Sequence, residues 1–195
     1  MPGRRSKNAA EAKPPTEFVA ALRKVLVKQK KEELVDLVVE LARADPRILR
    51  QLMLQFEASV APHELVAATR QAVADATAFD ARDINHNFNY DHAAYREAQQ
   101  NLNRLLELGQ FDTAMELALE LMKLGSYQVE MSDEGLMTSE IGDCLRPVIQ
   151  AVNKSGLPRN EALDWCLAML KNDRVGCIAT GELRALQSRL EAFMP

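Results

Sequence analysis

From Thr16 to the end of the chain, apolar side chains recur every three or four residues, which is the spacing of one face of an α-helix. Residues 34–41 follow this spacing most plainly. Along one face of that segment lie Leu34, Leu37, Val38 and Leu41, at positions i, i+3, i+4 and i+7. Asp45 and Pro46 then supply an N-cap and a first-turn proline for another helix. We therefore expect a helix that ends near Ala44 and buries Leu37, followed at once by a second helix.

The same reasoning predicts eight or nine helices over the whole chain. They cover approximately residues 16–26, 34–44, 46–56, 62–73, 90–108, 111–121, 141–152, 160–170 and 181–193. The polar residues 126–134 predict a connector, and Pro147 predicts a kink or a restart inside its helix. The connections are short, so neighbouring helices should run antiparallel. The expected fold is all-α, an irregular array of about eight or nine antiparallel helices.

Composition divides the chain into three parts. Residues 1–15 mix Pro, Gly, Ser, Lys and Ala without periodic apolar positions and should form a disordered basic tail. Asp and Asn side chains, which favour turns and caps, crowd into residues 78–91. We therefore expect a four-helix segment at residues 16–78 and, packed on it, a helical-hairpin region at residues 79–195. The two parts could equally form one continuous domain.

One turn in the sequence resembles that of a tetratricopeptide repeat. Residues 105–114 read LLELGQFDTA, in which the glycine allows tight contact and the aromatic ring two residues later packs across a helical hairpin. No second copy recurs at the period of about 34 residues that a regular array needs. The array is therefore predicted to be TPR-like, or α-solenoid-like, without a regular repeat.

Three short segments resemble landmarks of a known family. Residues 34–46, LVDLVVELARADP, are similar to the L-x-x-L-x-x-x-L-A-x-x-D-P run of the bacterial α-helical region found after SWIM-type zinc fingers. Residues 89–95 and 140–145 resemble that region's D-Y-x-x-A-Y and I-G-D-x-L landmarks, in the same order. The finger's C-x-C and C-x-H spacing is absent from this sequence, so its zinc and any DNA role tied to it do not carry over. The resemblance implies an accessory α-helical interaction domain.

Overall composition narrows the class of protein. Hydrophobic residues make up 47% and charged residues 27% of the 195 positions, which excludes wholly disordered and disulfide-stapled classes. No apolar run approaches the ~20 residues that cross a bilayer, and residues 1–15 hold no secretory signal. We expect a cytoplasmic protein without membrane contact. Its three cysteines, Cys144, Cys166 and Cys177, form no C-x-x-C pair and should be reduced and mostly packed.

Positive and negative charges are distributed unevenly along the chain. Residues 1–31 carry nine Lys and Arg against two Glu, a net charge of +7, whereas the rest carries 15 against 26 and is −11. Within the tail, Arg4, Arg5, Lys7 and Lys13 are candidate contacts for nucleic acid, because clustered cations release phosphate counterions. The alternative is a solubilising tail, since no aromatic side chain interleaves these charges to stack on bases.

Three interpretations fit the alternating Asp and Asn residues 83–91. Asp83, Asn85 and Asn87 match the first ligands of an EF-hand, but Phe88 and Ala94 stand where Gly and Glu are required. Local turns plus an N-cap account for the pattern more simply. The third interpretation is a recognition surface. Its candidate partner-binding residues are His86, Tyr90, Asp91 and Tyr95, whose rings could equally belong to the core.

The known catalytic and phosphate-binding motifs are absent from the sequence, and the histidines have no cysteines at zinc spacing. We therefore expect no catalytic residue, no metal ligand and no cofactor. The leading hypothesis is a protein–protein interaction or scaffold module of a bacterial intracellular complex, which binds another protein or a peptide. The alternative is a nucleic-acid-associated accessory protein that uses the basic N-terminal segment, and the third is a weak metal-binding protein or an enzyme. The sequence predicts no oligomeric state.

Overall fold

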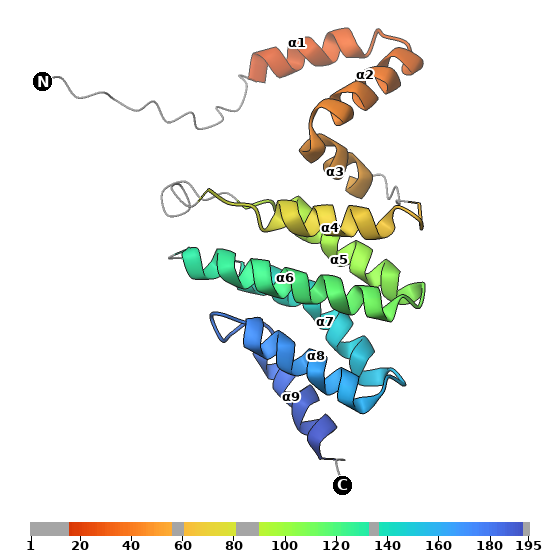
Figure 1. Ribbon diagram of the computed structural model, residues 1–195. Helices are drawn as coiled ribbons and strands as arrows, with labels where there is room; N and C mark the ends of the chain where they lie inside the picture. Colours follow the sequence, from red (N-terminus) through yellow and green to blue (C-terminus); the bar gives the residue numbers. More distant parts are fainter. Residues whose placement is uncertain (1–15, 56–60, 81–89, 133–136, 193–195) are drawn as a thin grey trace, which may run out of the picture. The chain divides into compact units, whose positions relative to one another are not determined.

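The computed structural model describes residues 16–55, 61–80, 90–132 and 137–192 (Figure 1). These residues form nine α-helices and no strand, which confirms the all-α class. No helix among them is both long and apolar enough to cross a bilayer. The chain divides into two units, residues 1–49 (unit 1) and residues 50–195 (unit 2).

Unit 1 contains α1 (Thr16–Leu26), α2 (Lys31–Ala44) and the start of α3 (Pro46–Gln55). Asp45 caps α3 as predicted, because its Oδ1 accepts a hydrogen bond of 2.9 Å from the backbone N–H of Arg47. The expectation that Leu37 lies in a core was wrong. Its side chain is 43% exposed, and Val38 and Leu41 on the same face of α2 are exposed as well.

Unit 2 holds the hydrophobic core. Its helices are α4 (Leu65–Ala76), α5 (His92–Glu107), α6 (Phe111–Met131), α7 (Thr138–Lys154), α8 (Arg159–Asn172) and α9 (Thr180–Glu191). Consecutive helices pair as α4 with α5, α6 with α7, and α8 with α9. Alternate helices also pack on one another, so that α4, α6 and α8 form one layer and α5, α7 and α9 form the other (Figure 1). Large side chains such as Leu102, Leu121 and Leu145 are fully buried within these helices.

The division of the chain differs from the predicted boundary after residue 78. It falls between Leu49 and Arg50, and α4 belongs to unit 2, where it packs on α5 and α6. Leu65 and Val73 of α4 are fully buried in the same core as α5 and α6. The apolar face of α4 is therefore buried by later helices. The spacing of its apolar residues predicts such a face but not which helices cover it.

Two glycines permit tight geometry in unit 2. Gly109 adopts a φ of +72°, the left-handed conformation expected of it at the end of α5. Gly125 lies in the middle of α6, where a Cβ would come within 2.8 Å of the Cδ1 of Ile141. A side chain at position 125 would therefore require that of Ile141 in α7 to shift.

The predicted polar connector at residues 126–134 was wrong over residues 126–131, because α6 continues to Met131. Two of its polar side chains, Ser126 and Gln128, are buried and bonded to distant backbone. The hydroxyl of Ser126 donates to the carbonyl of Asn172 at 2.6 Å, and Nε2 of Gln128 donates to the carbonyl of Ala76 at 3.1 Å. Tertiary hydrogen bonds thus stabilise helix where polarity alone predicted a loop.

Of the kink or restart predicted at Pro147, the restart was wrong, since α7 runs unbroken from Thr138 to Lys154. A proline has no N–H, so the carbonyl of Asp143, four residues earlier, lacks its donor within the helix. Gln99 of α5 replaces that donor, with its Nε2 2.9 Å from the Asp143 oxygen. A side chain from the neighbouring helix therefore makes the proline tolerable inside α7.

Candidate functional site

The structure describes three of the predicted contact residues, Tyr90, Asp91 and Tyr95. The tail candidates Arg4, Arg5, Lys7 and Lys13 lie outside the described residues. The same holds for His86 and for the EF-hand-like positions Asp83, Asn85 and Asn87. Among the described residues, no group of three or more His, Cys, Asp or Glu side chains is arranged to hold a metal ion.

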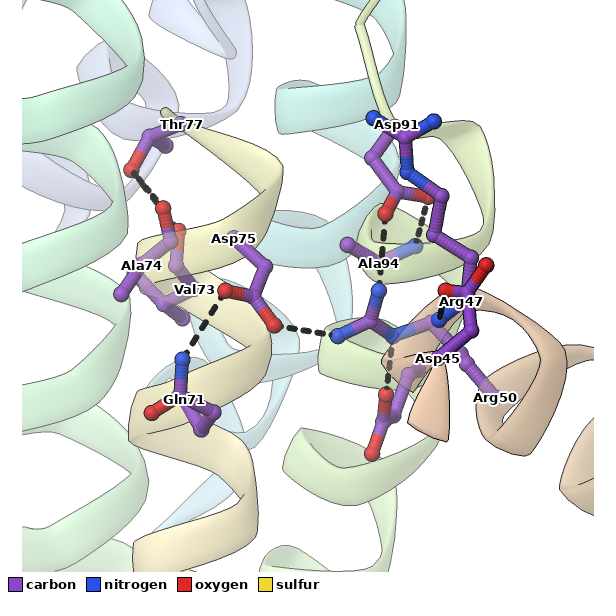
Figure 2. A network of polar contacts seen from close by, with 11 residues as sticks. Asp45, Arg47, Arg50, Gln71, Val73, Ala74, Asp75, Thr77, Asp91 and Ala94 are labelled. Carbon is purple, nitrogen blue, oxygen red and sulfur yellow. Dashed lines mark hydrogen bonds and ion pairs between the residues drawn. The ribbon is translucent and has the colours of Figure 1, made fainter. Parts of the chain in front are cut away.

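Asp91 is occupied by the fold on both of its carboxylate oxygens (Figure 2). Its Oδ1 accepts from the backbone N–H of Ala94 at 3.0 Å, which caps α5 as the turn-and-cap interpretation expects. Its Oδ2 accepts from Nη1 of Arg50 at 2.7 Å. This residue is therefore placed to hold α5, and we leave it out of the candidate surface.

Arg50 is the centre of a network that the sequence did not reveal. Its guanidinium, 6% exposed, also donates to Asp75 of α4 and to Glu97 of α5, both at 2.5 Å. Burial disfavours the charge of Arg50, but the hydrogen bonds to Glu97 and Asp75 outweigh it and raise its pKa. One planar cation thus joins Asp75 of α4, Glu97 of α5 and Asp91 at the N-cap of α5. Figure 2 shows its contacts with Asp75 and Asp91.

Tyr95 is a core residue. The sequence left open whether its ring contacts a partner or belongs to the core. Its ring is 2% exposed, and its hydroxyl donates to Oε1 of Gln128 at 2.6 Å. Gln128 in turn donates to the backbone of Ala76, so the pair links α5, α6 and the end of α4. Burial raises the pKa of Tyr95 well above its usual range.

Replacing Tyr95 with phenylalanine should therefore lower the free energy of unfolding by about 1 to 2 kcal/mol, because Oε1 of Gln128 would lose its buried donor. Urea denaturation followed by the fluorescence of Trp165, the single tryptophan, measures this. The matched control is Tyr127→Phe, since Tyr127 is 39% exposed. Equal stability of the two variants would show that the Tyr95 hydroxyl contributes nothing.

Tyr90 lies in a cluster with Glu140 and His92, at the start of α5 and of α7. Its hydroxyl donates to Oε1 of Glu140 at 3.1 Å, and its ring centroid is 4.2 Å from that of His92. Nδ1 of His92 lies 3.7 Å from the same carboxylate oxygen, while the Ser139 hydroxyl donates to Oε2 at 2.7 Å. Glu140 is thus the common acceptor of the cluster.

The environment of Glu140 keeps it charged. Burial works to raise its pKa, but hydrogen bonds from Ser139, from its own backbone N–H and from Tyr90, with His92 nearby, lower it overall. For Tyr90, burial and then the bond to Glu140 raise the pKa. At neutral pH the cluster therefore presents a carboxylate and a neutral phenol.

Glu140→Gln should destabilise the protein by about 1 kcal/mol at neutral pH, because the amide loses charge-assisted hydrogen bonds. A carboxyl group with a lowered folded-state pKa stabilises above its unfolded pKa and ceases to do so as pH falls through the folded value. The difference between wild type and Glu140→Gln should therefore begin to shrink below the ordinary pKa of about 4.5 and vanish once pH falls below the lower folded-state pKa. Denaturation curves at pH 7, 5 and about 3 measure it. A difference that grows in acid contradicts the assignment.

Next to this cluster is a hollow of about 210 Å³, the α5–α7 hollow. It is lined by His92, Tyr95, Arg96 and Gln99 of α5 and by Glu140, Asp143 and Cys144 of α7. Two of the segments that resemble family landmarks, residues 89–95 and 140–145, therefore line one hollow although about 50 positions separate them in the sequence. The buried Tyr95 and Cys144 form its apolar part, and Arg96, Glu140 and Asp143 give it charged groups.

Two further hollows lie along α7 and α9. The second, of about 330 Å³, lies where α7 and α9 begin and shares Asp143 with the α5–α7 hollow. The third, of about 300 Å³, is lined by residues such as Ile149 and Ala185, and it shares Glu182 with the second. Because each neighbouring pair shares a lining residue, the three hollows adjoin one another along the layer of α5, α7 and α9.

Arg146 organises the charge of the second hollow. It donates to Oδ1 of Asp143 at 2.7 Å and to Oε1 of Glu182 at 3.2 Å. Hydrogen bonds from its own backbone N–H and from Arg146 lower the pKa of Glu182. Both shared residues, Asp143 and Glu182, are thus held on one cation and remain partly exposed.

The cysteines fit the predicted packed thiols at two of three positions. Cys144 and Cys166 are buried, whereas Cys177 is exposed. Burial raises the pKa of Cys144 to about 12 and that of Cys166 to about 11, so both thiols stay protonated at neutral pH. Cys144 donates weakly to the carbonyl of Tyr95 at 3.2 Å. In the α5–α7 hollow, Cys144 therefore serves as a packed, protonated thiol.

Comparison of the chain with models of protein families, with curated proteins and with solved structures finds no match. The resemblance to the region after SWIM-type zinc fingers therefore stays a prediction, and the candidate site is defined by its geometry alone.

Proposed function

We propose that unit 2 is a protein-interaction module that binds a peptide segment of another protein along the layer of α5, α7 and α9, without catalytic chemistry of its own. The observation that carries this proposal is the row of three adjoining hollows on that layer. Each is about the size of one or two side chains, and together they suit an extended or helical segment that inserts successive side chains. Stacked helical hairpins commonly use one helix layer in this way.

Charge indicates the chemistry of the segment. Residues 50–195 carry 13 Lys and Arg against 21 Asp and Glu, a net charge of −8. Such a field raises the rate at which a positively charged partner associates and favours its correct orientation. Carboxylates of Glu140, Asp143 and Glu182 line the hollows, each of which is also lined by one arginine, Arg96, Arg146 or Arg189. We therefore propose a lysine- or arginine-rich segment as the ligand.

Asp143→Lys tests this proposal, because Asp143 lines two hollows and its side chain is 54% exposed. Peptides selected from a random library on the full-length chain should be rich in Lys and Arg. The substitution should weaken them about tenfold, equivalent to about 1.4 kcal/mol. The matched control is Asp164→Lys, at an exposed position of α8 in the other layer, and it should change affinity less than about twofold.

Two outcomes would overturn the proposal. One is a library that yields no peptide retained by the folded chain. The other is equal weakening by Asp143→Lys and Asp164→Lys, which would indicate an effect of net charge without a defined face. Trp165 fluorescence checks that both variants remain folded.

Nucleic-acid binding by the tail is a second proposal, and it rests on the opposite charges of the two ends of the sequence. Residues 1–49 carry 11 Lys and Arg against seven Asp and Glu, whereas residues 50–195 are strongly acidic. Deleting residues 1–15 removes Arg4, Arg5, Lys7 and Lys13. If these contact phosphates, the slope of log affinity for single-stranded DNA against log salt should fall by about 3. An unchanged slope rejects the proposal.

A further inference from the structure

The two helices of unit 1 expose apolar surface on a scale that single folded chains rarely show. The side chains are large and each is two-fifths or more exposed. They are Phe18, Val19, Leu22, Val25 and Val27 in and just after α1, and Val35, Leu37, Val38, Val39 and Leu41 in α2. The extremes are Val27 at 77% and Val38 at 41%. Single exposed apolar side chains are ordinary, but ten large ones exposed within residues 18–41 indicate an interface.

Neither helix is long enough to persist in water without burying this surface. α1 has 11 residues and α2 has 14. Isolated helices of that length are marginal even for favourable sequences, and valine lowers helix propensity further. Within unit 1, the described residues of α1 and α2 do not pack extensively on each other. Neither helix therefore covers the apolar surface of the other.

The charges of residues 17–45 are arranged so that two copies of this segment can attract each other. Residues 17–31 hold five Lys and Arg against one Glu, a net charge of +4, and residues 32–45 hold five Asp and Glu against one Arg, a net charge of −4. An antiparallel second copy places the positive half of each chain beside the negative half of the other. A parallel arrangement would place like charges together, which is unfavourable.

The exposed area is also sufficient for a dimer. With about half of each side chain accessible, the ten residues present on the order of 1,000 Å² per copy, compared with about 800 Å² per partner in a standard stable interface. The largest apolar patch of a typical monomer is about 300–600 Å². We propose that residues 17–45 form an antiparallel two-fold interface with a second copy of this chain, in which α1 of each copy packs on α2 of the other.

This interface would give the particle two copies of unit 2. A partner with two basic segments would then bind with higher apparent affinity than either segment alone, because the second contact is intramolecular. The proposal does not depend on the hollows of unit 2, since its residues all lie in unit 1.

Sedimentation equilibrium of the full-length chain at micromolar concentration tests the association directly. The expected mass is twice 21.8 kDa for the wild type. Leu22→Asp combined with Leu37→Asp should give 21.8 kDa, because it places carboxylates in both apolar faces. The control Ala20→Asp lies on the other side of α1 from Leu22 and should remain a dimer.

A charge-exchange experiment distinguishes this pairing from general stickiness. Arg23→Glu with Lys24→Glu makes α1 acidic, and Asp36→Lys with Glu40→Lys makes α2 basic. Each double variant alone should be mainly monomeric at low salt, because like charges then face each other. An equal mixture should form a heterodimer, since each acidic helix meets a basic one.

Three results would overturn the proposal. The first is a wild-type chain that sediments as a monomer, including one that instead binds vesicles of anionic lipid through α1. The second is association into larger species without a limiting dimer. The third is a mixture of the two charge variants that associates no better than either variant alone.

Discussion

Replacing Arg50 with methionine should lower the free energy of unfolding of unit 2 by about 3 kcal/mol, with a fall in Tm of roughly 6 to 12 °C. The substitution keeps an unbranched, flexible stem but leaves Asp75, Asp91 and Glu97 facing one another without their shared cation. Asp91 would also be less firmly held as the cap of α5. Urea denaturation followed by Trp165 fluorescence reports this loss.

Two controls separate the network from charge in general. Arg50→Lys should recover only part of the stability, because an ammonium group cannot reach three carboxylates as the planar guanidinium does. Arg70→Met removes a cation that also bridges two carboxylates, Glu116 and Glu120, but on a side chain that is 48% exposed. It should cost less than about 1 kcal/mol. If Arg50→Met and Arg70→Met unfold alike, the network is not a main support of unit 2.

The second large effect is expected at Leu145, which is fully buried in α7. Leu145→Ala should cost about 3 to 4 kcal/mol, through lost apolar burial and the cavity left behind. Leu37→Asp introduces a charge but at a side chain that is 43% exposed in unit 1. It should change the Trp165 transition by less than about 0.5 kcal/mol.

Leu108→Ala provides the matched control, since Leu108 is 47% exposed within unit 2 and its truncation should cost little. A Trp165 transition lowered as much by Leu37→Asp as by Leu145→Ala would place Leu37 in the same core as Trp165. That result would contradict the exposure of α2.

Much of the secondary structure could be predicted from periodicity and caps, because these are local. Asp45 begins α3 and Gly109 follows α5, each by a conformation its own residue type favours. The continuation of α6 through Ser126 and Gln128 could not be predicted, because the partners that satisfy these side chains lie 46 and 52 residues away. The same holds for the unbroken helix at Pro147. The carbonyl of Asp143, which loses its donor to the proline, accepts a hydrogen bond from Gln99 of another helix instead.

The candidate site divides in the same way. Tyr90 was identified from the residues that surround it, but Glu140, its acceptor 50 residues later, was not assigned a role. Asp91 and Tyr95 were identified with it, yet their side chains are taken up by Arg50 and Gln128. Sequence pattern finds residues able to make polar contacts, and only the fold decides which of them remain available to a partner.

The most direct measurement of the central proposal is a pair of proton–nitrogen correlation NMR spectra of the full-length chain, with and without a lysine-rich peptide selected on it. The proposal predicts that the largest shifts fall on residues 92–99, 138–146 and 182–189, which line the three adjoining hollows, and that Asp143→Lys reduces these shifts at the same peptide concentration. Shifts confined to α4, α6 and α8, or to unit 1, would contradict it.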